Sequence, residues 1–408
     1  MMQPRTVVYL MLAISLLVGA TRAEGADFLY SRTIQNPSAS GTDQFGATMA
    51  QSGDALLIGA TGEEVPSNHY ANGGAAYLFD VTDGALQRTF REPTPTWYNS
   101  FGRSVSLSGT NAVIGTSAGL AYRFDTTTGV TVPLPSPIPA GNYFGDERSV
   151  AAVGTGAVVS AHSDDSQAAG SGRAYFYDAS GTLTGPINNP SSVPDYDSFG
   201  SAVAATDTRI LVGALGDDPG AGNAGAAFLF DVTGTLLMTF NNPYPALNDQ
   251  FGWSVALSDD YVLIGDRNNA SNYIGAAYLF DHGGTLLHTL ANPNPTNGDA
   301  FSFAMAISGN DILIGAPWED LYGNDAGAAY LFNAVTGDLV QTLSSPTPAV
   351  GGAFGQSVGI SGDYLAIGAP GVGTYLGEAY VFERVPEPAS LWLLGSALAV
   401  LLGLRRRR

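Results

Sequence analysis

The sequence contains no cysteine and no lysine, so all sixteen of its basic residues are arginine. Disulfides and thiolate metal sites are therefore excluded, as are lysine and cysteine nucleophiles. Charged residues are few, at 13%, and 36 acidic residues outnumber the basic ones to give a net charge of -20. Such a chain repels phosphate backbones, which argues against any nucleic-acid partner. The hydrophobic fraction of 45% is nevertheless sufficient for a folded core.

The first 23 residues have the pattern of a secretory signal peptide. Arg5 is followed by an apolar run over residues 7–19 and then by small residues up to Ala23. A basic start, an apolar centre and a small-residue end are typical of a segment that is cleaved during export. A short membrane anchor is the alternative, although the apolar run is shorter than the ~20 residues that a membrane span needs.

The C-terminal segment, residues 385–408, combines a short acidic motif, an apolar stretch over residues 389–404 and a basic end. A helix of that length reaches ~24 Å, which is marginal for a ~30 Å hydrocarbon core. The arginines favour the cytoplasmic side, so we expect a stop-transfer tail whose last residues stay behind when the body of the protein is exported. The flanking residues are Pro386, Glu387, Pro388, Arg405, Arg406, Arg407 and Arg408.

These three parts, in this order at the end of the sequence, resemble the PEP-CTERM sorting signal. The resemblance implies a Gram-negative bacterium and recognition by an exosortase, a membrane protease-transpeptidase. It also implies transient insertion of the C-terminal helix into the inner membrane. Release or attachment at the cell surface or in the extracellular matrix follows, often in producers of exopolysaccharide. A permanent tail anchor is the alternative.

Between the two ends the sequence repeats seven times. Each unit contains four short, alternating or β-branched segments separated by turn residues, which predicts strands. Four-stranded units in series predict an all-β fold, a seven-bladed β-propeller over residues 27–384. The six intervals between the first and last unit average 51.5 residues, and the units open with Phe-Gly, or Phe-Ser once, at Phe45, Phe101, Phe144, Phe199, Phe251, Phe301 and Phe354.

Small residues recur at fixed places in the units. Fourteen residues after the phenylalanine, six units have glycine, whereas the third has a two-residue insertion and reaches Ser160. In the first strand of a unit, small residues such as Thr48 alternate with larger ones such as Met49. One face of this strand is therefore thin enough for neighbouring blades to converge.

The two ends of the repeat region predict how the propeller closes. The seventh unit stops after its third strand, at Phe382. The segment LYSRTIQNP at residues 29–37 resembles the fourth strand of other units, such as TLLHTLANP ending at Pro293. We expect residues 29–35 to complete the last blade, which removes an unpaired edge.

The Phe-Gly openings, together with Gly-Ala-Pro at residues 315–317 and 368–370, resemble the FG-GAP repeats of the integrin α-chain propeller. Calcium-binding repeats of that family have a DxDxDG loop between the first and second strands. The corresponding loops here are as short as SGD or SDD, too short to surround a cation with six or more oxygens. We therefore expect no calcium at the family's positions, and no other metal or cofactor.

One face of the predicted propeller collects acidic and aromatic residues. The loops between strands two and three and between strands four and one emerge on this face, called the loop face below. Aromatic rings beside carboxylates suit sugars, and exposed aromatics often anchor protein contacts. Solvated polar loops and a cation site are the alternatives. The predicted binding residues are Glu63, Asp217, Asp218, Asp266, Arg267, Trp318, Glu319, Asp320, Tyr322 and Asp325.

An aspartate or asparagine also stands two residues before the phenylalanine in six units, as at Asp43 and Asp197. We interpret it as a structural Asx turn that starts the first strand.

No catalytic pattern is evident. The four histidines are spread over three units, and no HExxH, GxSxG or phosphate-loop motif occurs. Adjacent acids such as Asp217 and Asp218 suggest glycosidase chemistry, but adjacent side chains point apart. We predict a non-catalytic binding or adhesion module for a glycan or protein. A passive component of the extracellular matrix and an enzyme acting on polysaccharides are the alternatives.

Overall fold

The computed structural model describes residues 27–38, 41–64, 72–95, 97–139, 141–191, 195–268 and 273–385. The predicted signal peptide and the sorting signal beyond residue 385 lie outside these ranges. Within them, no helix is long and apolar enough to span a membrane. The predicted C-terminal helix lies outside the part of the chain to which this finding applies.

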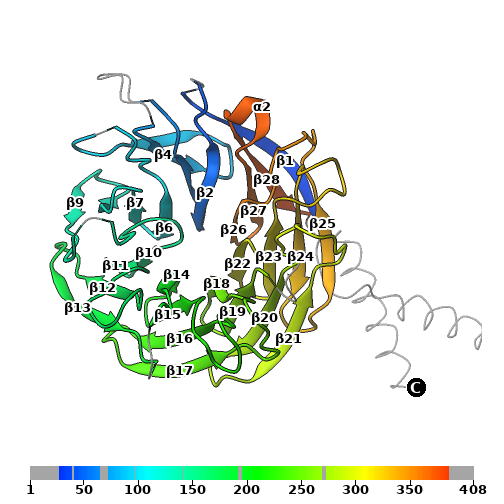
Figure 1. The fold of residues 1–408 in the computed structure, drawn as a ribbon. Coiled ribbons are helices and arrows are strands. Elements are labelled where there is room, and N and C mark those ends of the chain that lie inside the picture. Colours follow the sequence, from blue (N-terminus) through cyan, green and yellow to red (C-terminus); the bar gives the residue numbers. More distant parts are fainter. Residues whose placement is uncertain are drawn as a thin grey trace, which may run out of the picture. The chain divides into compact units, whose positions relative to one another are not determined.

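Seven four-stranded antiparallel sheets follow one another around a common centre and form the blades of a propeller (Figure 1). The prediction of an all-β, seven-bladed propeller is confirmed. In blades 1 to 6 the strands run in sequence order, and the first strand of each blade lies innermost.

The strands have the following bounds. Blade 1 contains β2 (Phe45–Ser52), β3 (Ala55–Ala60), β4 (Ala75–Asp80) and β5 (Leu86–Phe90). Blade 2 contains β6 (Ser104–Ser108), β7 (Asn111–Gly115), β8 (Ala121–Asp125) and β9 (Thr131–Leu134). Blade 3 contains β10 (Val150–Val153), β11 (Gly156–Ala161), β12 (Arg173–Tyr177) and β13 (Leu183–Asn188). Blade 4 contains β14 (Phe199–Ala205), β15 (Arg209–Ala214), β16 (Ala226–Asp231) and β17 (Leu236–Asn241).

Blade 5 contains β18 (Phe251–Leu257), β19 (Tyr261–Asp266), β20 (Ala276–Asp281) and β21 (Leu286–Ala291). Blade 6 contains β22 (Ala304–Ser308), β23 (Asp311–Ala316), β24 (Ala328–Asn333) and β25 (Leu339–Leu343). Blade 7 contains β26 (Ser357–Ser361), β27 (Tyr364–Ala369) and β28 (Glu378–Arg384), with the one-turn helix α2 (Val372–Tyr375) between the last two.

The fourth strand of blade 7 is β1 (Phe28–Gln35), which comes from the opposite end of the repeat region. It pairs with β28, as the sequence predicted, and Gln35 Nε2 donates a hydrogen bond of 3.0 Å to Glu378 Oε1. On the inner side of the same junction, Ser357 Oγ donates to the Gly46 carbonyl at 2.7 Å. Blades 7 and 1 therefore join, and the ring of blades is closed.

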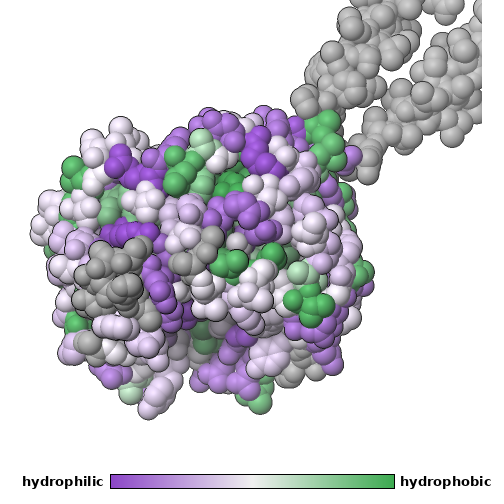
Figure 2. All heavy atoms as spheres, turned by 90° about the horizontal axis from the view of Figure 1, so that it is seen from above, coloured by the Kyte–Doolittle hydropathy of each residue, from purple (hydrophilic) through white to green (hydrophobic). Residues whose placement is uncertain are grey.

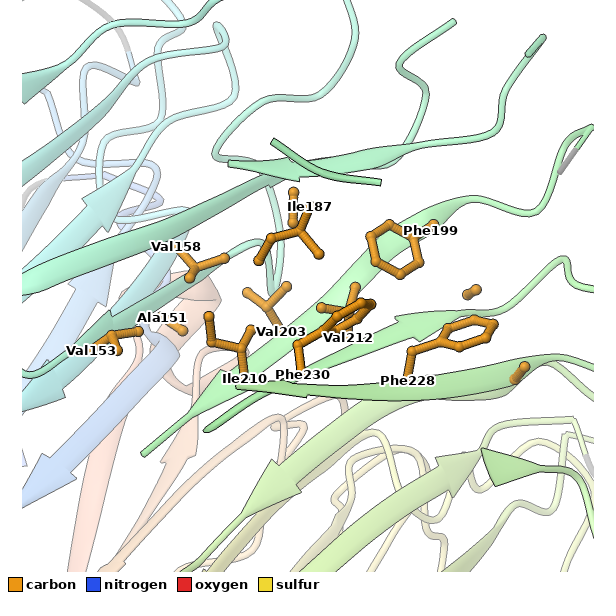
Figure 3. Packing of buried hydrophobic residues seen from close by; sticks show 13 residues of the cluster. Ala151, Val153, Val158, Ile187, Phe199, Val203, Ile210, Val212, Phe228 and Phe230 are labelled. Carbon is orange, nitrogen blue, oxygen red and sulfur yellow. The ribbon is translucent and has the colours of Figure 1, made fainter. Parts of the chain in front are cut away.

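The hydrophobic core lies between neighbouring blades, because each hydrophobic cluster takes residues from two adjacent sheets. Figure 3 shows the cluster between blades 3 and 4, where Phe199, Phe228 and Phe230 lie across from Val158 and Ile187. The ring of Phe199 meets that of Phe230 edge-on, with centroids 6.0 Å apart. The phenylalanine that opens each unit is at most 2% exposed in all seven units, so it is a core residue in each.

Close backbone contacts between blades explain the repeated glycines. A Cβ atom on Gly315 would lie 1.9 Å from the carbonyl oxygen of Gly355, which opens the next blade with φ +95°. Side chains larger than hydrogen are therefore excluded at this contact. In the third unit, Ser160 Oγ instead donates to the Gly200 carbonyl at 2.6 Å. Thr48 Oγ1 donates likewise to the Gly102 carbonyl, so the small face of the first strand does meet the next blade.

Candidate functional site

The acidic residues that begin several of the second-to-third loops are buried, not exposed. Glu319 is fully buried and accepts hydrogen bonds from Tyr330 Oη at 3.0 Å and Asn294 Nδ2 at 2.9 Å. Glu63 is equally buried and accepts from the Tyr77 hydroxyl and from Arg91 Nη2, the latter at 2.5 Å. Each carboxylate thus satisfies the hydroxyl of a buried tyrosine on the third strand.

Electrostatics agree with a structural role for these pairs. Burial raises the pKa of the Glu319 carboxyl, and burial together with the nearby Glu319 charge raises the pKa of Tyr330. Where the loop acid is missing, another carboxylate serves the tyrosine: Tyr122 Oη donates to Glu92 Oε1 at 3.1 Å. Glu63, Asp266 and Glu319, three of the predicted binding residues, are thus 0% exposed and present no surface to a ligand in this structure.

Other loop acids close their own loops. Asp218 Oδ1 accepts a hydrogen bond from the backbone N–H of Asn223 at 2.6 Å, and Asp320 Oδ1 accepts from that of Asp325 at 2.8 Å. Both are bonds to the residue five positions later, so the two acids hold equivalent loops of blades 4 and 6. Asp218 and Asp320 are exposed and Asp325 is half-buried.

Blade 4 differs from the other blades in one buried contact. Its third strand has Phe228 where all six other blades have tyrosine and therefore offers no hydroxyl to Asp217, which is half-buried. Burial raises the pKa of Asp217, and burial also raises the pKa of the neighbouring Asp197 to about 6. The carboxylates of this blade therefore carry their charge at a higher energetic cost than ordinary surface acids.

The acids two residues before the phenylalanine hold the fourth-to-first loops. Asp43, Asp197, Asp249 and Asp299 are buried, and each accepts a hydrogen bond from the asparagine that directly follows the preceding strand, at 2.8, 2.8, 3.0 and 2.8 Å. In blade 2 the roles are exchanged, because Asn99 Nδ2 donates to Glu92 Oε2 at 2.6 Å. The structural interpretation is confirmed, but the partner lies across the loop and not two residues along the chain.

A cavity of about 310 Å³ occupies the centre of the ring. The larger residues of the first strands line it, one from each blade: Met49, Val105, Val150, Val203, Val255, Met305 and Val358. The residue two positions earlier in the chain is not one repeated type, since only blades 2 and 3 share it. This set, called the mouth ring below, consists of Ala47, Arg103, Arg148, Ser201, Trp253, Phe303 and Gln356.

Two arginines, Arg148 of the mouth ring and Arg267 of a nearby loop, contact aromatic residues of the mouth ring. Arg148 Cζ lies 4.2 Å from the ring centroid of Trp253 and 5.1 Å from that of Phe303, so it reaches from blade 3 to blades 5 and 6. Arg267, from the second-to-third loop of blade 5, places its Cζ 4.2 Å from the same Trp253 centroid. We call the group of Arg148, Trp253, Arg267, Tyr273, Phe303 and Trp318 the arginine–aromatic cluster.

Arg267 lies among three aromatic rings. Its Cζ is 5.4 Å from the centroids of both Tyr273 and Trp318, and Trp318 packs on Phe303 with centroids 5.5 Å apart. Arginine over an aromatic face is a favourable contact that leaves the edge of the guanidinium open to acceptors. The cluster therefore has flat apolar surfaces and hydrogen-bond donors in one place.

The cluster also has an excess of positive charge. Arg103 forms ion pairs with Asp146 at 3.0 Å and Glu147 at 2.7 Å, and Glu147 also meets Arg148 at 3.4 Å. Burial lowers the pKa of Arg148 to about 10. The charge of Glu147 opposes this shift, whereas the charges of Arg267 and Arg103 add to it. Arg103 and Arg148 thus share two carboxylates, and among the described residues Arg267 pairs with neither.

Exposed aromatic residues surround the mouth on the loop face. Tyr98, Tyr196 and Tyr244 are 64%, 71% and 65% exposed. Five tyrosines have a left-handed backbone with φ between +53° and +70°, which is unfavourable for a bulky residue: Tyr98, Tyr143, Tyr196, Tyr273 and Tyr375. On the side that Figure 2 shows, hydrophilic and hydrophobic residues are interspersed, as on an ordinary protein surface.

The structure gathers only some of the predicted binding residues. Arg267 and Trp318 meet in the cluster, with Tyr322 40% exposed in the same loop as Trp318. The residues that sequence reasoning missed are Arg103, Arg148, Trp253 and Phe303. The available signal was the two-residue insertion: if Asp146 and Glu147 are the added pair, Arg148 aligns with the other mouth-ring positions. Within the described residues, no group of three or more histidine, aspartate or glutamate side chains is placed to hold a metal ion.

Comparison with protein families supports both sequence resemblances. The FG-GAP repeat family matches residues 190–230, 245–280, 288–332 and 339–382, which fall in blades 4 to 7. The PEP-CTERM protein-sorting motif matches residues 384–408. The chain carries FG-GAP repeats and a PEP-CTERM sorting motif. No curated protein matches the chain.

The FG-GAP repeats agree with the architecture, because the Phe-Gly pair and the later glycine are the two sides of the inter-blade contact described above. The PEP-CTERM motif indicates an exported protein of Gram-negative bacteria that is sorted by an exosortase, with processing at the membrane.

Proposed function

We propose that this FG-GAP propeller is a non-catalytic binding or adhesion module that acts at the cell surface or in the extracellular matrix. Its contact surface is the loop face, and its ligand is a glycan or a protein. The proposal needs no cofactor. The observation that carries it is the set of exposed tyrosines with left-handed backbones, such as Tyr98 at φ +61° and Tyr196 at φ +62°.

Strained backbones persist where the surrounding structure holds them, and they cluster at functional sites. Exposed aromatic side chains also provide much of the energy of protein contacts and stack well on sugars. Among the carboxylates that glycoside cleavage would need, Glu63 and Glu319 bind buried tyrosines and Asp218 closes its own loop. These contacts favour binding over catalysis.

The test compares the full chain with two triple variants. Tyr98→Ser, Tyr196→Ser and Tyr244→Ser remove exposed rings from the loop face. Leu86→Ser, Leu237→Ser and Leu287→Ser remove apolar side chains that are also exposed but lie on the outer strands β5, β17 and β21. Binding is measured on glycan arrays and in adhesion to bacterial cells.

We expect the tyrosine variant to lose at least about tenfold in affinity, since several anchoring residues are removed, and the leucine variant to bind normally. Equal binding by both variants would contradict the loop face as the contact surface. A wild-type chain that binds no glycan or cell would instead favour a passive matrix component, and turnover of a polysaccharide would favour an enzyme.

A further inference from the structure

The arginine–aromatic cluster stands out because arginine is rare in the propeller. Only ten arginines lie between residues 24 and 387, against 36 acidic residues. Three of the ten, Arg103, Arg148 and Arg267, lie at or beside the mouth ring. Positive charge is therefore concentrated at one point of a strongly acidic protein, which an anionic group would experience as a local attractive site.

The three arginines are not equally satisfied. The carboxylate of Glu147 is shared between Arg103 and Arg148, at 2.7 and 3.4 Å. Among the described residues Arg267 forms no ion pair, and its Nε has no hydrogen-bond partner. Trp253 Nε1, in the ring that both Arg148 and Arg267 contact, also has no partner. Two donors without a partner thus belong to residues in direct contact, Arg267 and Trp253.

Burial lowers the pKa of Arg267 as well as that of Arg148, and each guanidinium lies within 4.2 Å of the same indole centroid. Two like charges held this close, with one shared carboxylate nearby, are stabilised when a further anion approaches. The half-buried position strengthens that interaction relative to a fully solvated arginine.

We infer that the arginine–aromatic cluster is a binding site for the carboxylate of an acidic sugar, a uronic acid residue, with Arg267 as its main partner. This inference rests on the proposed binding function and names its ligand class. The planar guanidinium presents paired donors that match a carboxylate. Glu147 already makes one contact with Arg103 and one with Arg148, so the site beside Arg267 does accept a carboxylate.

A sugar fits the surroundings of Arg267 better than an acidic peptide does. The ring centroids of Trp318 and Tyr273 both lie 5.4 Å from Arg267 Cζ, and Tyr273 is 45% exposed. These flat surfaces suit the apolar face of a pyranose, while the carboxylate reaches the guanidinium. The net charge of -20 also repels densely charged polyanions, so we expect an isolated or terminal uronate to bind.

The experiment uses galacturonic acid and its neutral counterpart galactose as probes of the full chain in mild detergent. Tryptophan fluorescence reports on the site, because two of the four tryptophans, Trp253 and Trp318, lie in the cluster. We expect galacturonate to bind about tenfold more tightly than galactose, the effect of one charge-assisted hydrogen-bonded pair.

Two substitutions at one position and one control test the assignment. Arg267→Gln should reduce the preference for galacturonate to about one, and Arg267→Lys should retain part of it, since the charge remains without the paired donors. Arg209→Gln, at the start of β15, should keep the full preference. Thermal melting of each variant shows whether the fold is intact, and Arg267→Lys serves if the glutamine variant does not fold.

Equal affinity for the two sugars in the wild-type chain overturns the inference, as does a preference that survives Arg267→Gln. Tighter binding of an aspartate-rich peptide than of galacturonate overturns it too. If the wild-type chain binds neutral sugars or cells without preferring the uronate, this inference fails while the proposed function stands. If it binds nothing, the proposed function fails.

Discussion

The contacts between blades and the residues of the mouth ring differ in one respect: the first are repeated around the propeller and the second are not. Phenylalanine opens all seven units and is buried each time, and glycine or serine meets the next blade. At the mouth ring, by contrast, alanine, serine, glutamine, arginine and aromatic residues occupy equivalent positions. Repetition therefore marks what every blade needs in order to pack, and variation marks where this chain differs from a generic propeller.

The largest effect should come from the repeated contacts. Gly315→Ala places a Cβ 1.9 Å from the Gly355 carbonyl oxygen, so blades 6 and 7 must separate. We expect the free energy of unfolding to fall by about 3 kcal/mol, measured by urea denaturation. Gly185→Ala is the matched control, because a Cβ there meets no atom within 4 Å. Similar losses in both variants would show that the inter-blade contact is not the cause.

The pairs of tyrosine and carboxylate should give the next largest effect. Tyr330→Phe removes the hydroxyl that donates to Glu319 and leaves a buried carboxylate with fewer partners. We expect a loss of about 2 kcal/mol in the free energy of unfolding. The reverse change in blade 4, Phe228→Tyr, offers Asp217 the hydroxyl that it lacks and should stabilise by up to about 1 kcal/mol. Destabilisation by both changes would contradict the equivalence of the two loops.

A smaller effect is expected from the pH dependence of blade 4. Burial raises the pKa of Asp197 from 3.8 to about 6, so the folded protein binds more protons than the unfolded chain between those values. The contribution of Asp197 to stability is therefore full below about pH 4 and is lost as the pH rises through 6. Asp197→Asn removes this dependence while keeping the size of the side chain.

Urea denaturation between pH 4 and pH 7 measures the difference between wild type and Asp197→Asn. We expect the variant to gain stability over wild type as the pH rises. Asp259→Asn, at an exposed site, serves as the control. A difference that does not change with pH would show that Asp197 is ionised in both states.

The smallest effect on stability should come from the exposed ring of Tyr244, which is 65% exposed. Tyr244→Ser should change the free energy of unfolding by less than about 0.5 kcal/mol, as surface substitutions usually do. Binding to glycans or cells should nevertheless weaken. A thermal melt and a binding assay on the same preparation separate the two properties, and unchanged binding would remove Tyr244 from the contact surface.

The sequence predicted the propeller well because its evidence is local and repeated. The sequence of residues 29–37 resembles a fourth strand, and the seventh unit lacks one, so the two together predicted the pairing of β1 with β28. The burial of Glu63 and Glu319 was missed, because their tyrosine partners lie on another strand and loop position alone suggests exposure. Arg148 was missed because it contacts Trp253, which lies in another blade and over a hundred residues away in the sequence. The repeat pattern shows which positions are equivalent, but not which side chains of different blades meet.

The closing pair of strands has a consequence for the order in which the protein folds. Gln35 and Glu378 are separated by 343 residues. β1 is therefore synthesised first, but it can pair with β28 only after the other blades have been made. Until then, β28 offers an open edge that another chain could pair with. Contacts this distant in sequence form slowly. An intermediate in which blade 7 still lacks its fourth strand is therefore the state most prone to misassembly. Pairing of β1 with β28 covers the open edge and ends that risk.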